Sequence, residues 1–111
     1  MSIEQKRVGT VDVMAPAGPI VDEDAEELIA LMAEKISTAN PRFVLNMEKV
    51  PYIDSRGIEG LVETSDSLMS RGSRLRLAGT SATCREALEL TGQSRKVDYF
   101  DSLQDAVRSF L

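Results

Sequence analysis

Asp54 and Ser55 are the residues of this 111-residue chain whose types and placement are best suited to chemistry. They follow an apolar segment, residues 43–47, and a short loop that contains Pro51, and a stretch with helical periodicity begins just after them. The first backbone N–H groups of a helix have no partner inside the helix, and the helix dipole favours an anion there. A phosphate group on Ser55 would therefore lie close to suitable donors.

The same spacing also fits an ordinary helix cap, because Asp and Ser are preferred at the position before a helix. On spacing alone, capping is the preferred interpretation of this pair. Gly57, which follows two residues later, has no Cβ and would leave room for the backbone of a partner to approach closely.

The composition excludes several kinds of active site. The chain has no His and a single cysteine, Cys84, so neither a Ser-His-Asp or Cys-His arrangement nor a zinc site of Cys and His can form within it. The acidic run 22–27 lacks the spacing of a calcium-binding loop and fits a solvated helix start. We expect no enzymatic activity, no metal and no cofactor.

Charge and hydropathy limit the partners. The net charge of −5 argues against nucleic acid, which is bound by clustered Lys and Arg. The nearest basic group, Arg71, Arg74 and Arg76, flanks Gly72, and we expect these side chains to be the solvated ends of two elements. No apolar run approaches the roughly 20 residues that cross a bilayer, and residues 1–7 lack the apolar core of a signal peptide. We expect a cytoplasmic protein without membrane insertion.

The elements that must position Ser55 can be located from the pattern. Periodicity predicts helices over residues 22–38, from about 55 to 71, over 81–91 and from 102 onward, with Gly72 and Gly92 ending the second and third. Strands are predicted over 3–7, 10–14, 42–47, 74–77 and 97–100, and residues 15–19 are expected to stop regular structure. Four methionines are expected in the core: Met14, Met32, Met47 and Met69.

This order predicts one α/β domain over residues 1–111, with a mixed, mostly parallel sheet of four to five strands and about four helices. The first two strands form an antiparallel hairpin. Sheets of this kind carry functional loops beyond the carboxyl ends of their strands, and the loop that leads into Asp54 lies at such an edge.

Residues 44–58 resemble the signature of the STAS family, the bacterial anti-sigma-factor antagonists. In that family, an apolar strand ending in Asp or Asn is followed after a short loop by Asp-Ser-x-Gly-Ile/Leu. Asn46 matches the end of the strand, Asp54 and Ser55 the acid and the phosphorylated serine, and Gly57-Ile58 the start of the helix. The resemblance extends over nearly the whole chain, including Gly18 with residues 25–28 and the later strand 75–79.

The resemblance implies a partner switch. The unphosphorylated protein would bind an anti-sigma factor that is also a serine kinase of the GHKL type, so that the sigma factor is released. Phosphorylation of Ser55 by that kinase, with ATP and magnesium, would weaken the complex, and a serine phosphatase would restore it. The binding surface would be centred on Asp54, Ser55, Arg56 and Gly57, with Ile58 and Tyr52 as apolar contacts and Asn46 supporting the loop.

The first loop departs from the family pattern, and the resemblance also allows another role. Many family members carry an acid and then Asp shortly after the glycine of the first loop, whereas this chain has Pro19 and Val21, and Asp22 would take the role one residue later. The chain could also be a STAS subunit of a lipid-transport ABC complex or of a stress-signalling assembly, which binds constitutively without phosphorylation. A small enzyme or nucleotide-binding protein is disfavoured, because the chain has no His and no Walker motif.

Overall fold

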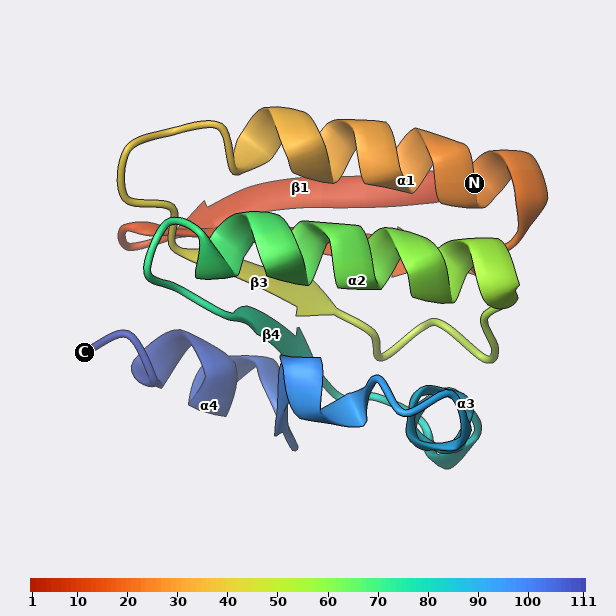
Figure 1. The fold of residues 1–111 in the computed structure, drawn as a ribbon. Coiled ribbons are helices and arrows are strands. Elements are labelled where there is room, and N and C mark those ends of the chain that lie inside the picture. The colour runs from red at the N-terminus through yellow and green to blue at the C-terminus, as the bar shows by residue number, and fades with distance from the viewer.

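The computed structural model describes residues 1–111, which form a five-stranded sheet in the order β1-β2-β3-β4-β5 (Figure 1). The strands are β1 (Ser2–Val8), β2 (Val11–Ala17), β3 (Phe43–Asn46), β4 (Leu75–Ala78) and β5 (Val97–Phe100). The helices are α1 (Asp22–Lys35), α2 (Ser55–Met69), α3 (Ala82–Leu90) and α4 (Leu103–Arg108), and a short 3-10 turn, η1 (Ser94–Lys96), precedes β5. Strand β1 pairs antiparallel with β2, and all other neighbours are parallel. The predicted α/β class and order of elements are confirmed.

Alternation along β3 and β4 assigns their side chains to two cores on opposite faces of the sheet. Leu45 and Leu77 are fully buried in the larger core, which also contains residues of α1, α2 and α3. Val44 and Ala78 belong to the smaller core, where they pack with Ala106 of α4. Phe43, Val44 and Leu45 make β3 apolar on both faces, because helices cover both faces of the sheet.

Glycines end two helices in the same way. The N–H of Gly72 donates to the carbonyl of Met69, and the N–H of Ser73 donates to the carbonyl of Leu68. This pair of bonds is a Schellman motif, and the φ of 78° at Gly72 is the left-handed conformation that it requires. Gly92, with a φ of 74°, ends α3 with the equivalent bonds. Both predicted helix stops are therefore confirmed.

The prediction that residues 15–19 stop regular structure is wrong for 15–17, because β2 continues through Pro16 to Ala17. Strand β3 pairs only with residues 12–14 of β2, so beyond Met14 one side of β2 has no ladder partner. Pro16 is tolerated opposite Ile3 of β1 because a missing N–H costs little on such an unpaired side.

Two smaller predictions are also wrong. Helix α1 ends at Lys35 rather than at residue 38, and the hydroxyl of Ser37 donates to the carbonyl of Glu34 at 2.7 Å, which satisfies a group at the helix end. Met69 is 46% exposed in the last turn of α2, whereas the other three predicted core methionines are buried.

Candidate functional site at the amino end of α2

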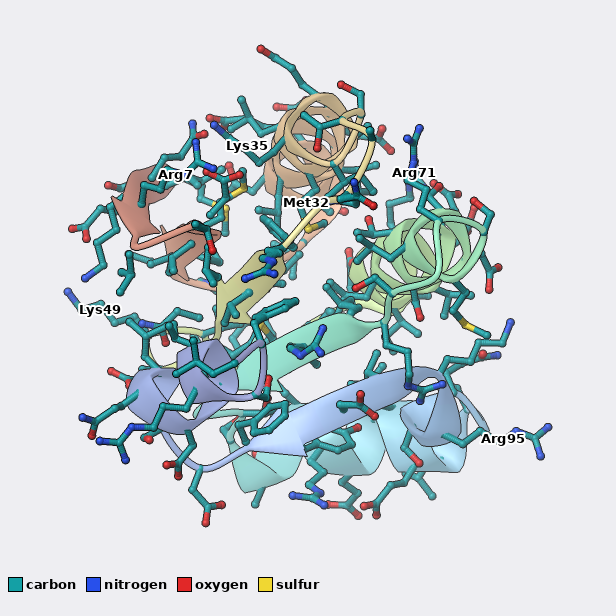
Figure 2. The ribbon with its side chains drawn as sticks, turned by 90° about the vertical axis from the view of Figure 1, so that its left-hand side faces the viewer. Arg7, Met32, Lys35, Lys49, Arg71 and Arg95 are labelled. Carbon is teal, nitrogen blue, oxygen red and sulfur yellow. The ribbon has the colours of Figure 1, made fainter.

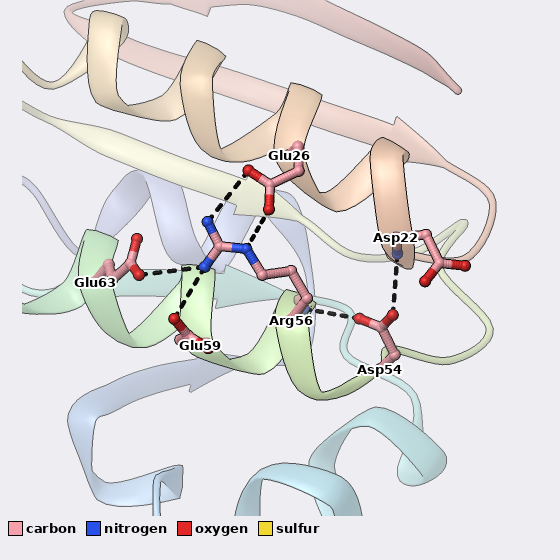
Figure 3. A network of polar contacts seen from close by, with 7 residues as sticks. Asp22, Glu26, Asp54, Arg56, Glu59 and Glu63 are labelled. Atoms are coloured by element: carbon pink, nitrogen blue, oxygen red, sulfur yellow. Dashed lines mark hydrogen bonds and ion pairs between the residues drawn. The ribbon is translucent and has the colours of Figure 1, made fainter.

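Asp54 holds the amino ends of two helices together (Figure 3). Its Oδ1 accepts a hydrogen bond of 2.8 Å from the N–H of Gly57 and so caps α2. Its Oδ2 accepts a hydrogen bond of 3.0 Å from the N–H of Asp22, the first residue of α1. Val21, at the N-cap position of α1, provides no side-chain cap, so Asp54 provides one from the other helix. Asp22 thus contributes its backbone to this site.

The same bonds define the protonation state of Asp54. The N–H groups of Gly57 and Asp22 hold the pKa of the Asp54 carboxyl below its ordinary value. An ionised carboxylate with both oxygens engaged is a weak proton acceptor. Asp54 therefore positions the amino end of α2 and is poorly suited to deprotonate the neighbouring Ser55.

The backbone before α2 is bound to the first loop. Ile20 and Ile53 form an isolated parallel bridge, in which the N–H of Ile20 donates to the carbonyl of Tyr52 and the N–H of Asp54 donates to the carbonyl of Ile20, each at 3.1 Å. Gly57 lies buried against this bridge, where an added Cβ would come within 2.7 Å of the Ile20 carbonyl oxygen. The room that Gly57 leaves is taken up inside the domain, not by the backbone of a partner.

Ser55 is the first residue of α2, and its side chain is exposed. Its hydroxyl makes no hydrogen bond within the protein, because the capping bond to Gly57 comes from Asp54 instead. Asp54 caps α2, and the Ser55 hydroxyl is therefore not needed for capping. The hydroxyl of Ser55 is accessible to another molecule.

The Arg56 side chain extends from the amino end of α2 toward Glu59 and Glu63 of the same helix and toward Glu26 of α1 (Figure 3). Its guanidinium binds both carboxylate oxygens of Glu26 on α1. Its Nη1 also donates to Glu59 and to Glu63 on α2, at 3.2 Å in both cases. The hydrogen bond with Arg56 lowers the pKa of Glu26, and the bond with Glu26 raises the pKa of Arg56. Three carboxylates around one guanidinium leave this surface beside Ser55 net negative.

Ser55 also borders a groove between α2 and the turn that follows α3. Four residues of α2 line it at helical spacing, and two residues come from the end of α3 and beyond: Ser55, Ile58, Glu59, Val62, Thr91 and Gln93. The volume is about 240 Å³. Ser55 and Ile58 are expected in the site from the sequence, whereas Thr91 and Gln93 are not, because no local pattern connects residues 91–93 with α2.

The remaining predicted site residues lie on the loop between β3 and α2. Tyr52 is 51% exposed, which leaves its ring available for contact. The Oδ1 of Asn46, at the end of β3, accepts a hydrogen bond of 3.1 Å from the N–H of Glu48. Asn46 therefore shapes the first turn of the loop.

The structure shows no metal site and no membrane span. No three Cys, Asp or Glu side chains come together as metal ligands. No helix has both the length and the apolar character needed to cross a bilayer.

A parallel sheet with an antiparallel entry hairpin, and an Asp-Ser pair at the amino end of its second helix, are the features of a STAS domain. The model of the family described as STAS domain matches residues 2–106, and the chain belongs to this family. The search of curated protein sequences found no match to this chain.

Solved structures share the fold. An anti-sigma factor antagonist from Mycobacterium paratuberculosis is 19% identical, with a TM-score of 0.84 over 97% of this chain and 92% of the other. The Bacillus cell fate determinant SpoIIAA in its phosphorylated form is 17% identical, with a TM-score of 0.76 over 99% of this chain and 100% of the other. A sulfate transporter family protein from Wolinella succinogenes is 27% identical, with a TM-score of 0.74 over 94% and 88%. The fold thus occurs both in antagonists and in transporter-family proteins.

Proposed function

We propose that this chain is an anti-sigma factor antagonist whose partner binding is controlled by phosphorylation of Ser55. The observation that carries the proposal is the exposed Ser55 hydroxyl, free of internal hydrogen bonds, at the first position of α2. The likeness to SpoIIAA, a protein known in a phosphorylated form, supports it. The binding surface consists of Ser55, Ile58, Tyr52 and the α2–α3 groove.

The chain would act as a phosphoryl acceptor and not as a catalyst. The partner, an anti-sigma factor and serine kinase of the GHKL type, transfers the γ-phosphoryl group of ATP to the Ser55 oxygen with magnesium, and ADP leaves. The Ser55 proton goes to a base on the kinase, because the Asp54 carboxylate is engaged by two N–H groups. A serine phosphatase returns the protein to its binding form in the cytoplasm.

Electrostatics explain why the phosphorylated form would bind more weakly. Phosphorylation adds roughly −1.5 to −2 charges at neutral pH. Glu59 lies in the same groove as Ser55, and the cluster around Arg56 is already net negative. A partner that fits the unmodified surface has no counter-charge for the phosphate group, so binding would remove the added charge from water at a cost in free energy.

The constitutive alternative keeps the fold but not the switch. The likeness to a sulfate transporter family protein favours a STAS module that binds its assembly permanently. A subunit of a lipid-transport ABC complex or of a stress-signalling assembly would behave in the same way. Retention of the partner by Ser55→Asp would favour this alternative.

Mass spectrometry of the protein isolated from its own host in growing and stressed cells tests the modification itself. The proposal predicts a fraction that carries one phosphate group on Ser55, removed by a serine phosphatase. A protein that carries no phosphate on Ser55 in any condition, in cells where the partner is present, would contradict it.

A further inference from the structure

An arginine-lined pocket opens at the pole of the molecule opposite Ser55, where α1 and α2 end. This pole faces the viewer in Figure 2, in which Arg71 is labelled beside the end of α2. The pocket has a volume of about 540 Å³, and its lining includes four arginines and one carboxylate: Arg42, Arg71, Arg74, Arg76 and Asp98. This concentration of positive charge contrasts with the net charge of −5 for the whole chain. Arg71 is exposed, as expected of a solvated end, whereas Arg76 is partly buried against the Phe110 ring.

Most of this positive charge is not neutralised within the protein. Only Arg74 has a carboxylate partner, since its Nε lies 3.0 Å from Asp98. Arg42 donates to the hydroxyl of Thr10 at 3.0 Å, and Arg71 to the carbonyl of Thr38 at 2.9 Å. A guanidinium has five N–H donors, so each of these two keeps most of its donors unused.

Arg76 is held at the pocket by contacts that fix its position. Its Nε donates to the hydroxyl of Ser109 at 2.7 Å, and its guanidinium carbon lies 3.6 Å from the centre of the Phe110 ring. Burial lowers the pKa of Arg76, which reflects a partly desolvated cation without a carboxylate in contact. An anion that enters the pocket would form charge-assisted hydrogen bonds with this guanidinium and so stabilise its charge.

Capping of helix ends does not account for the cluster. The last carbonyls of α2 already accept bonds from the N–H groups of Gly72 and Ser73. Arg71 alone bonds to a carbonyl beyond the end of α1. Arg42 bonds to the hydroxyl of Thr10 and Arg76 to the hydroxyl of Ser109, so neither guanidinium is used to cap α1 or α2.

We propose that this pocket binds a small phosphorylated ligand, whose phosphate group is held by Arg42, Arg71 and Arg76. Guanidinium groups bind phosphate oxygens through paired N–H donors, and several such groups are matched by an anion with two or more charges. The volume leaves space for an organic group attached to the phosphate. The site is separate from Ser55 and does not depend on its phosphorylation.

Calorimetric titration of the whole chain with inorganic pyrophosphate tests the site at low ionic strength. Wild type is expected to bind, and Arg42→Gln and Arg76→Gln are each expected to weaken binding by roughly tenfold, as the loss of a charged hydrogen bond does. Arg85→Gln is the matched control, because it removes the same charge from α3, where Arg85 stacks on Tyr99 outside the pocket. Arg42 is exposed, so its replacement leaves the fold intact even if Arg76→Gln loosens the packing on Phe110.

Three results would overturn the proposal: no binding by wild type, unchanged binding by Arg42→Gln, or equal weakening by Arg85→Gln, which indicates only a general charge effect. The phosphate group could also belong to a lipid. Flotation with phosphatidylcholine vesicles that contain phosphatidic acid distinguishes this source. Binding to these vesicles without binding to pyrophosphate would replace a soluble ligand with a membrane surface and contradict the proposal.

Discussion

The Oδ2 of Asp54 accepts a hydrogen bond of 3.0 Å from the backbone N–H of Asp22, and this bond joins the first turn of α2 to the first turn of α1. The φ of 47° at Asp22 is in the left-handed region, which Asp tolerates better than most residues. The bond brings an N–H of α1 to a carboxylate that already caps α2. The position of Ser55 therefore depends on both helices.

Asp54 is expected to stabilise the fold through both bonds. Replacement by Ala should reduce the free energy of unfolding by about 2 kcal/mol, because it removes a cap and a second charge-assisted hydrogen bond. Asp54→Asn keeps one acceptor oxygen and should lose about half as much. Urea unfolding of the two variants measures this, and an equal loss would show that only one of the bonds matters.

The pH dependence of stability should reveal the same carboxylate. The pKa of Asp54 is lowered in the folded protein, so its stabilising effect is present above the pKa of the unfolded chain, about 3.9, and is lost as the pH falls through the folded value. The difference in unfolding free energy between wild type and Asp54→Asn should be constant from about pH 7 to about pH 5 and shrink below about pH 4. A difference that persists unchanged in acid would contradict this role.

Gly57 and Gly60 should respond differently to replacement by Ala. A Cβ on Gly57 would lie 2.7 Å from the backbone oxygen of Ile20, which cannot move without breaking the bridge to Ile53. A Cβ on Gly60 would lie 2.3 Å from Cδ1 and from Cγ1 of Ile29 on α1, but both atoms belong to a side chain, which can rotate away without moving any backbone. We expect Gly57→Ala to cost about 2 kcal/mol and Gly60→Ala less than half of that, because Ala also favours the helix. Thermal unfolding of both variants shows which one is less stable, and a larger loss of stability in Gly60→Ala than in Gly57→Ala would contradict this account.

The cluster around Arg56 should contribute little to stability despite its many contacts. The Arg56 side chain is 32% exposed and its three carboxylate partners are at least 50% exposed, so water and salt screen the interactions. Arg56→Gln should lower the urea midpoint of unfolding only slightly at low salt and still less in about 1 M NaCl. Urea unfolding at the two salt concentrations tests this, with Glu26→Gln for a double-mutant cycle. A cost that rises with salt would be inconsistent with the cluster's electrostatic role.

The order of elements could be predicted because each one carries a local signal. The helical spacing of the apolar face of α2, the glycine at 72 and the alternation of Leu75 and Leu77 all act over a few residues. Asp54 and Ser55 could be singled out in the same way, since they stand at a predicted helix start.

What the sequence could not reveal depends on contacts between distant parts of the chain. The bond between Asp54 and Asp22 spans 32 positions, and the ion pair of Arg56 with Glu26 spans 30. The inward role of Gly57 follows from the bridge between Ile20 and Ile53, which no local pattern announces. The arginine pocket depends likewise on the ends of several strands and helices that meet at one pole.

Recovery of partners from the lysate of the native host, with wild type, Ser55→Ala and Ser55→Asp as baits, tests the central claim most directly. Because the Ser55 hydroxyl makes no internal bond, both variants should keep the fold, and their thermal unfolding serves as the control. The account predicts that a serine kinase of the GHKL type is recovered by wild type and Ser55→Ala but not by Ser55→Asp. Equal recovery of a partner by all three baits would contradict the switch and establish constitutive binding.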